Sequence, residues 1–224
     1  MTKHLLRDLE QLSSELLQLT RKVEDQLSAA LACVMTRDAE NANKVIQTDD
    51  EIDRMEVKLE EDALKILALH QPVASDLRFI IAAIKINNDV ERIADLAANI
   101  AKRAVELSHM APVAPPDSFE EMAEKARLMV RQAITALIRR DAVLAKQVTR
   151  EDDTVDQLNR QIARHLRERM KDCAPDHIDP LMRWLSAVRH LERVADMSVN
   201  IAEDVIYMVE GDIVRHTRSS GSPG

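Results

Sequence analysis

Four pairs of acidic residues, each pair spaced four positions apart, are the part of this sequence best suited to chemistry. They form two sets, and the second set repeats the first after 103 residues in one pair and 101 in the other. The sets are Asp49 and Asp53 with Glu91 and Asp95, then Asp152 and Asp156 with Glu192 and Asp196. A repeat of this length indicates two copies of one supersecondary unit. The chain therefore has two candidate sites of the same kind.

On a helix, residues four positions apart lie on one face, one turn from each other. Two such rows on neighbouring helices would bring four carboxylates together. Two charges at about 6 Å repel by about 3 kcal/mol at an effective dielectric of about 20, and a bound cation relieves that repulsion. Oxygen ligands favour Mg²⁺, Ca²⁺ or Mn²⁺ and can also hold iron. Asn99 and Asn200 extend the two rows by one further turn and add possible amide ligands.

The ordinary alternative is a solvated helix face, on which acids lie opposite the apolar stripe and pair with nearby bases. Arg92, three residues from Asp95, could form such a pair. Against this interpretation, acids at i and i+4 destabilise a helix by about 0.2–0.5 kcal/mol per pair, and the chain keeps four such pairs.

Composition predicts that helices carry these rows. Hydrophobic residues make up 46% of the 224 residues but aromatic residues only 2%, and no glycine precedes Gly211. Such a chain is built from strong helix formers, so we expect an all-α protein. The net charge of −8 argues against nucleic-acid binding, and the longest apolar run is too short to span a bilayer. Cys33 and Cys173 lack metal-type spacing and are expected to be unpaired thiols in a reducing cytoplasm.

Prolines and caps divide the chain into six predicted helices: 3–36, 38–70, 75–110, 117–140, 141–172 and 179–213. We expect Asp38 and Asp141 to cap their helices, Ser118 to form a capping box with Glu121, and Asp179 to cap the last helix before Pro180. The expected architecture is two tandem three-helix bundles, residues 1–111 and 117–214, followed by a disordered tail, 215–224. A single six-helix bundle is the alternative.

Four short motifs recur in order and at fixed spacing: Pro72–Arg78, Glu91–Asp95, Glu151–Asp156 and Glu192–Asp196. In these motifs the chain resembles the PhoU family of bacterial phosphate-uptake regulators. The resemblance covers nearly the whole chain, to about residue 213, and the family usually has Gly at the positions of Ala94 and Ala195.

The resemblance implies two similar three-helix bundles in which the paired acids bind multinuclear iron or zinc clusters; manganese or magnesium is also considered. Asp49, Asp53, Glu91 and Asp95 would hold one cluster, and their four counterparts the other. It further implies a cytoplasmic negative regulator, peripheral to the inner membrane through its partners. Those partners would be the ATPase subunit of the phosphate ABC transporter, a sensor histidine kinase and a second copy of the chain.

A di-iron oxidase would need two Glu-x-x-His motifs, but the sequence has only the one that ends at His109, which we expect to be exposed or capping. No glycine-rich phosphate loop is present, so we expect no nucleotide hydrolysis. With both reactions set aside, we expect that the chain is not an enzyme. A metal-free adaptor, whose acidic rows bind a basic partner surface, remains open. Asp76 and Arg78 follow Pro72. We interpret Asp76 as a helix cap, and partner contact by Asp76 and Arg78 is the alternative.

Overall fold

The computed structural model of the chain describes residues 3–211. Within that range the backbone forms six long α-helices and one short 3-10 helix, and it contains no strand. In chain order these elements are α1 (Lys3–Thr36), α2 (Ala39–His70), α3 (Ala74–Ser108), α4 (Phe119–Arg139), α5 (Ala142–Lys171), η1 (Pro175–His177) and α6 (Ile178–Glu210). The predicted all-α class is confirmed, and the six predicted ranges differ from these helices by only a few residues. The predicted tail, 215–224, lies outside the described residues.

Two of the predicted helix caps form at equivalent places in the two halves. The Asp38 carboxylate accepts a hydrogen bond from the backbone N–H of Asn41 at 3.0 Å. The Asp141 carboxylate accepts from Val143 and Leu144 at 3.0 and 2.9 Å. Each cap satisfies N–H groups that the first turn leaves without an intrahelical partner.

The other two predicted caps are wrong. Ser118 has φ 64°, in the left-handed region, and its side chain makes no capping hydrogen bond, so the box with Glu121 does not form. A capping residue normally has an extended backbone, which brings its side chain over the first turn. Asp179 is not a cap because η1 runs directly into α6, which begins at Ile178 after His177. Asp179 lies instead in the first turn, where a negative charge favours the helix dipole.

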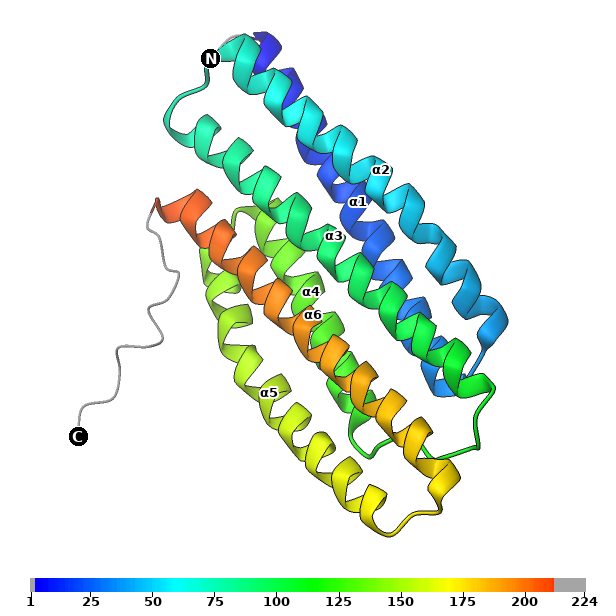
Figure 1. Cartoon of the computed structure of the whole chain (residues 1–224). Helices are drawn as coiled ribbons and strands as arrows, with labels where there is room; N and C mark the ends of the chain where they lie inside the picture. Colours follow the sequence, from blue (N-terminus) through cyan, green and yellow to red (C-terminus); the bar gives the residue numbers. More distant parts are fainter. Residues whose placement is uncertain (1–2, 212–224) are drawn as a thin grey trace, which may run out of the picture.

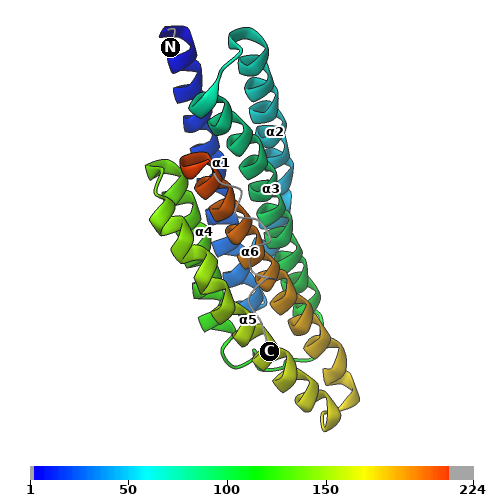
Figure 2. The ribbon, with the colours of Figure 1, turned by 90° about the vertical axis from the view of Figure 1, so that its left-hand side faces the viewer.

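The six helices form two three-helix bundles that lie side by side. Figure 1 shows α2, α3, α6 and α5 next to one another in that order, with α1 and α4 on the far side. Figure 2 shows the same arrangement from the left-hand side, with the long helix axes nearly aligned. The halves meet chiefly along α3 and α6, and also where α1 packs on α4. The predicted pair of tandem bundles is confirmed, and the pair shares one face of contact.

One continuous hydrophobic core runs through both halves. Helices α3 and α6 are buried on more than one side, since each packs against helices of both bundles. Small residues allow this close approach, including Ala94 and Ala195, at the positions where the PhoU family usually has glycine. Phe119 and Trp184 are fully buried and meet edge to face, with ring centroids 5.1 Å apart.

Polar contacts also join the halves across the α3–α6 seam. The Lys85 ammonium lies 3.3 Å from a carboxylate oxygen of Asp204, whose side chain is almost completely buried. Nearer the beginning of α3, Arg78 Nε donates to the Met208 carbonyl at 3.4 Å. These contacts fix the register of two helices that are more than 100 residues apart in the sequence.

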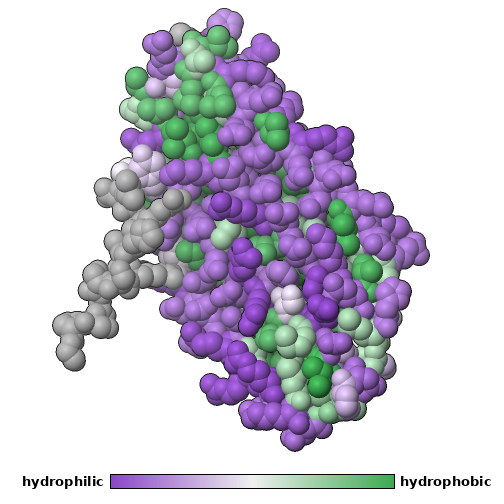
Figure 3. Space-filling view, viewed as in Figure 1, coloured by the Kyte–Doolittle hydropathy of each residue, from purple (hydrophilic) through white to green (hydrophobic). Residues whose placement is uncertain are grey.

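The surface in Figure 3 is mostly hydrophilic, with hydrophobic surface gathered toward its two ends. Two side chains at the α2–α3 connection, Leu69 and Val73, are 77% and 74% exposed. Among the described residues, no helix has the length and apolar character needed to cross a membrane. Cys33 is buried, Cys173 is half-buried, and neither forms a disulfide.

Candidate acidic sites

The first acidic set lies along the contact between α2 and α3, which we call the first groove. Asp49 and Asp53 project from α2, and Glu91 and Asp95 project from α3, which is the helix most closely packed against α2 in this half. Asp49 and Glu91 are half-buried, whereas Asp53 and Asp95 are exposed. The row on α3 therefore lies at the edge of a packed groove and not on a face turned wholly to solvent.

Electrostatic coupling shows that the α2 and α3 rows are close together. The pKa of Asp49 is raised by burial and then by the carboxylates of Asp95 and Asp53, while a hydrogen bond from Gln26 opposes the rise. The pKa of Glu91 is raised by burial, then by Asp95 and Asp53. Each of these two acids therefore interacts with acids on both helices, as the spacing predicted.

The second set repeats this arrangement between α5 and α6. Asp152 and Asp156 project from α5 and are half-buried, as is Glu192 of α6, while Asp196 is exposed. The pKa of Glu192 is raised by burial, then by Asp196, Asp156 and Asp152. The pKa of Asp196 is raised by burial, then by Asp152 and Asp156. Repulsion across the two helices is thus built into both halves.

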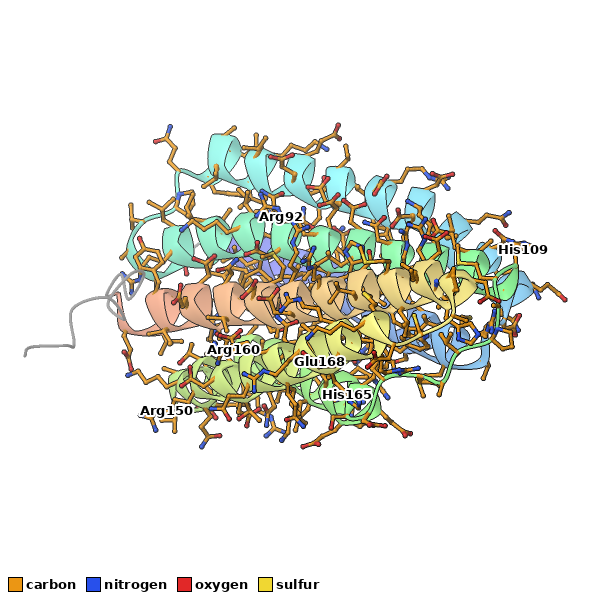
Figure 4. The ribbon with its side chains drawn as sticks, turned by 60° about the horizontal axis from the view of Figure 1, so that its bottom comes forward. Arg92, His109, Arg150, Arg160, His165 and Glu168 are labelled. Carbon is orange, nitrogen blue, oxygen red and sulfur yellow. The ribbon has the colours of Figure 1, made fainter. Side chains whose placement is uncertain are left out.

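Basic residues neutralise these rows only in part. Arg92 pairs with Asp89 and not with Asp95. Its guanidinium lies 3.3 Å from the carboxylate of Asp89, which precedes it by three residues. In the second half, Arg160 lies 3.5 Å from Asp156. Figure 4 labels Arg92 on α3 and Arg160 on α5. The alternative in which Arg92 pairs with Asp95 is therefore not what the structure shows, while one local pair exists in the second half.

The chemistry of the donors fits a hard cation, because all eight acids supply oxygen. Burial, and then neighbouring carboxylates, raise the pKa of four of them: Asp49, Glu91, Glu192 and Asp196. Within residues 3–211, however, no three His, Cys, Asp or Glu side chains are arranged as a ready-made metal site. Metal binding at these positions stays a prediction.

The two asparagines at the ends of the rows are half-buried. The Asn99 amide oxygen accepts a hydrogen bond from Lys102 at 3.4 Å, and the Asn200 amide donates weakly to the sulfur of Met197. Lys102 also lowers the pKa of Asp49, although less than the neighbouring acids raise it. The asparagines therefore lie at the edge of each row, and their role as metal ligands stays a prediction.

Sequence reasoning missed three residues around the first row. Gln26 of α1 is buried and donates to Asp49 at 3.4 Å, and Asn87 of α3 is buried and donates to Glu56 of α2 at 3.1 Å. Glu56 in turn raises the pKa of Glu91. For Gln26 and Asn87, the available signal was a polar residue at a helix position where the repeat and the periodicity both require an apolar one.

Asp76 and Arg78 lie where α3 begins. Val73 occupies the capping position, so the interpretation of Asp76 as the cap is wrong; Asp76 belongs to the first turn. It lines a cleft of about 400 Å³ between α1, α3 and the end of α4. Arg78 is directed toward α6 through its bond to Met208. A role of either residue in partner contact stays a prediction.

The isolated Glu-x-x-His motif does not point toward either acidic groove. Glu106 lies 3.0 Å from Arg103 and 3.0 Å from Arg183 of α6, so its carboxylate is already neutralised. His109 is exposed just after the last residue of α3, as Figure 4 shows. The expectation that this histidine is exposed or capping is confirmed.

The fold and the grooves define an all-α protein of two tandem three-helix repeats with matching acidic rows. The family model described as "PhoU domain" matches this chain twice, over residues 16–104 and 119–205. The chain belongs to the PhoU family. Each match lies within one of the two three-helix bundles.

Relatives and solved structures agree with this assignment. A protein of Aquifex aeolicus described as a phosphate-specific transport system accessory protein PhoU homolog is 37% identical over 212 residues, which is 95% of this chain and 96% of that protein. A Pseudomonas aeruginosa homolog with the same description is 38% identical over 93% of this chain and 86% of its own length. The crystal structure of PhoU from Pseudomonas aeruginosa has a TM-score of 0.87 at 36% identity, covering 92% of this chain and 99% of that one. The crystal structure of the phosphate transport system regulatory protein PhoU from Streptococcus pneumoniae also has a TM-score of 0.87, at 28% identity. The match covers 94% of this chain and 99% of that one.

Proposed function

We propose that this chain is an accessory regulatory protein of a phosphate transport system, and that it acts as a cytoplasmic negative regulator of phosphate uptake and of the phosphate-starvation response. Family membership over both halves supports this, together with relatives described as transport-system accessory proteins that match over nearly their full length. In this role the chain couples the ATPase subunit of a phosphate ABC transporter to a sensor histidine kinase. It acts by contact with these partners, as a homodimer, and not as an enzyme.

We further propose that each acidic groove holds a metal cluster, of iron or zinc. The observation that carries this proposal is the duplicated carboxylate coupling across paired helices, α2 with α3 and α5 with α6. Asp49, Asp53, Glu91 and Asp95 would hold the first, and their counterparts 103 or 101 residues later the second. A bound cluster would supply positive charge. The carboxylates would bind the cluster and so hold the two helices of each pair in one register. The surface of those helices that contacts partners would then keep one conformation.

Metal analysis of protein purified without chelator tests the cluster proposal. We expect more than one equivalent of iron, zinc or manganese per chain. Asp95→Ala should remove the metal of the first groove and Asp196→Ala that of the second, because each change deletes one carboxylate from an interhelical set. Asp50→Ala, on the exposed side of α2, is the matched control and should retain full metal content.

A pulldown with the transporter ATPase and the kinase cytoplasmic region, with and without chelator, tests the regulatory proposal. Binding that is lost with chelator supports a metal-dependent regulator. The metal-free adaptor is favoured if reconstituted protein contains no metal but the acid-to-amide variants still lose partner binding. Partner binding that is absent under every condition would refute the regulatory proposal.

A further inference from the structure

Four basic side chains follow one another along the second part of α5. They are spaced by four, three and four residues, and we call them the basic stripe: Arg160, Arg164, Arg167 and Lys171, all of them exposed. Residues at these spacings share one face of a helix, and the stripe is about 16 Å long. Ile162, which is buried, lies on the opposite face. The stripe therefore points away from the core, on the helix at the outer edge of the molecule in Figure 1.

Acids within the chain neutralise only the two ends of the basic stripe. The Arg160 guanidinium lies 3.5 Å from Asp156, and the Lys171 ammonium lies 2.8 Å from Glu168. The two arginines between them form no ion pair with any residue of the range 3–211. Of the stripe, only Lys171 belongs to the last turn, where the helix dipole favours a cation. Because cations three or four positions apart repel each other, the two central arginines make α5 itself less stable, and folding gives no reason for them.

The first half of the chain shows that this fold does not need cations on the outer face of the helix. Five of the six buried positions of α2 recur on α5 after 103 residues, so the two helices can be compared position by position. The counterparts of the basic stripe are Val57, Glu61, Leu64 and Ala68. All four are exposed, Val57 and Leu64 by 52% and 53%. Only the second half thus carries cations at these positions, which indicates a role for them outside the bundle.

The basic stripe has the chemistry to bind carboxylates. A guanidinium donates two parallel hydrogen bonds to one carboxylate, which an ammonium does not, and three of the four cations are arginines. The whole chain has a net charge of −8, and Asp153 and Asp156 precede the stripe on α5. A broad polyanion, such as a membrane surface or a nucleic acid, would meet this negative surface as well. A narrow acidic segment of a protein can contact the stripe alone.

We propose that the basic stripe is the docking surface for an acidic segment of a partner protein. A helix of about three turns, with carboxylates at the same spacing, matches the length of the stripe. The inference rests on the proposed function, because it assigns the stripe to one of the two partners proposed above, the transporter ATPase or the cytoplasmic region of the kinase. Exposed opposite charges steer association and select the partner more than they raise affinity, and salt screens them.

Binding of the full-length chain to each of these two partners, measured by biolayer interferometry at low and at high salt, tests the docking surface. The stripe variant, Arg164→Glu with Arg167→Glu, reverses the two central charges. We expect it to bind one partner about tenfold more weakly at low salt, because two exposed ion pairs are worth about that much. High salt should narrow the difference, because it screens exposed charges. Arg7→Glu with Arg21→Glu, at two exposed positions of α1, is the matched control for the change in net charge and should bind both partners normally.

Three results would overturn the docking surface alone. The first is unchanged affinity of the stripe variant for both partners, and the second is an equal loss in the stripe variant and the control. The third is that phosphatidylglycerol vesicles bind the unmodified chain but not the stripe variant, while both partners bind the two proteins equally. If the unmodified chain binds neither partner, the regulatory function itself fails, and the docking surface fails with it. Circular dichroism checks folding, and Arg164→Gln with Arg167→Gln, which introduces no acid, takes the place of a stripe variant that does not fold.

Discussion

Side-chain rotation decides how the acidic rows behave at the scale of single residues. Arg92 and Asp95 share a helix at a spacing that permits pairing, yet Arg92 contacts Asp89. Glu91 therefore retains the repulsion of Asp95, and its pKa is raised by burial and by its acidic neighbours. The charged forms of these acids oppose folding in the metal-free protein.

The raised pKa values predict that stability falls as pH rises. A carboxyl group whose pKa is higher in the fold than in the unfolded chain holds its proton more tightly when folded. The destabilisation is therefore absent at a pH below the pKa of the group in the unfolded chain, which is about 4. It is complete at a pH above the pKa of the group in the folded protein. Glu91→Gln and Asp196→Asn should each stabilise the metal-free protein at pH 7 by about 0.2–0.5 kcal/mol, because each removes the repulsion of one like-charge pair. Neither variant should be stabilised near pH 4.

Urea unfolding in chelator at pH 4 and pH 7 measures this difference. Asp50→Asn is the matched control, because Asp50 is an exposed acid of α2 outside the groove. It should change the free energy of unfolding little at either pH. A loss of stability at pH 7 in both Glu91→Gln and Asp196→Asn would contradict the proposed repulsion.

Helix starts give a direct comparison at the scale of elements. Asp141 and Ser118 both precede a helix of the second half, but only the Asp141 side chain reaches the N–H groups of the first turn. The α5 start is therefore held by local hydrogen bonds. The α4 start depends instead on burial of Phe119 and on the turn that follows Pro116.

Asp141→Ala should lower the free energy of unfolding by about 0.5–2 kcal/mol, the usual loss for a helix cap. Ser118→Ala should have almost no effect, since it removes no capping hydrogen bond. Equilibrium denaturation of the two variants under identical conditions tests the contrast. Equal losses would show that the cap geometry does not control stability here.

At the scale of the whole molecule, the seam between α3 and α6 joins the bundles into one cooperative unit. The core is continuous across the seam, and Lys85 contacts the buried carboxylate of Asp204 there. The proposed metal sites lie on the sides of α3 and α6 that face away from the seam, where α3 contacts α2 and α6 contacts α5. A change in either groove is therefore mechanically connected to the interface between the halves.

Lys85→Met should lower the free energy of unfolding by about 1–3 kcal/mol, because it removes a partner from a buried carboxylate. Unfolding should remain a single transition in urea, followed by circular dichroism, because the two halves share one core. The double variant Lys85→Met with Asp204→Leu should recover much of the loss, since no buried charge is then left. Separate transitions for the two halves would contradict a shared cooperative core.

The sequence by itself determined the helices, the duplication, the two correct caps and the helix face that each acid occupies. These features follow from local propensity and from periodicity, which act over a few residues. The tertiary structure alone decided that Arg92 contacts Asp89, that α4 and α6 begin without side-chain caps, and that Gln26 and Asn87 support the first groove. Such contacts depend on side-chain rotation and on packing between distant helices, and no spacing along the chain encodes them.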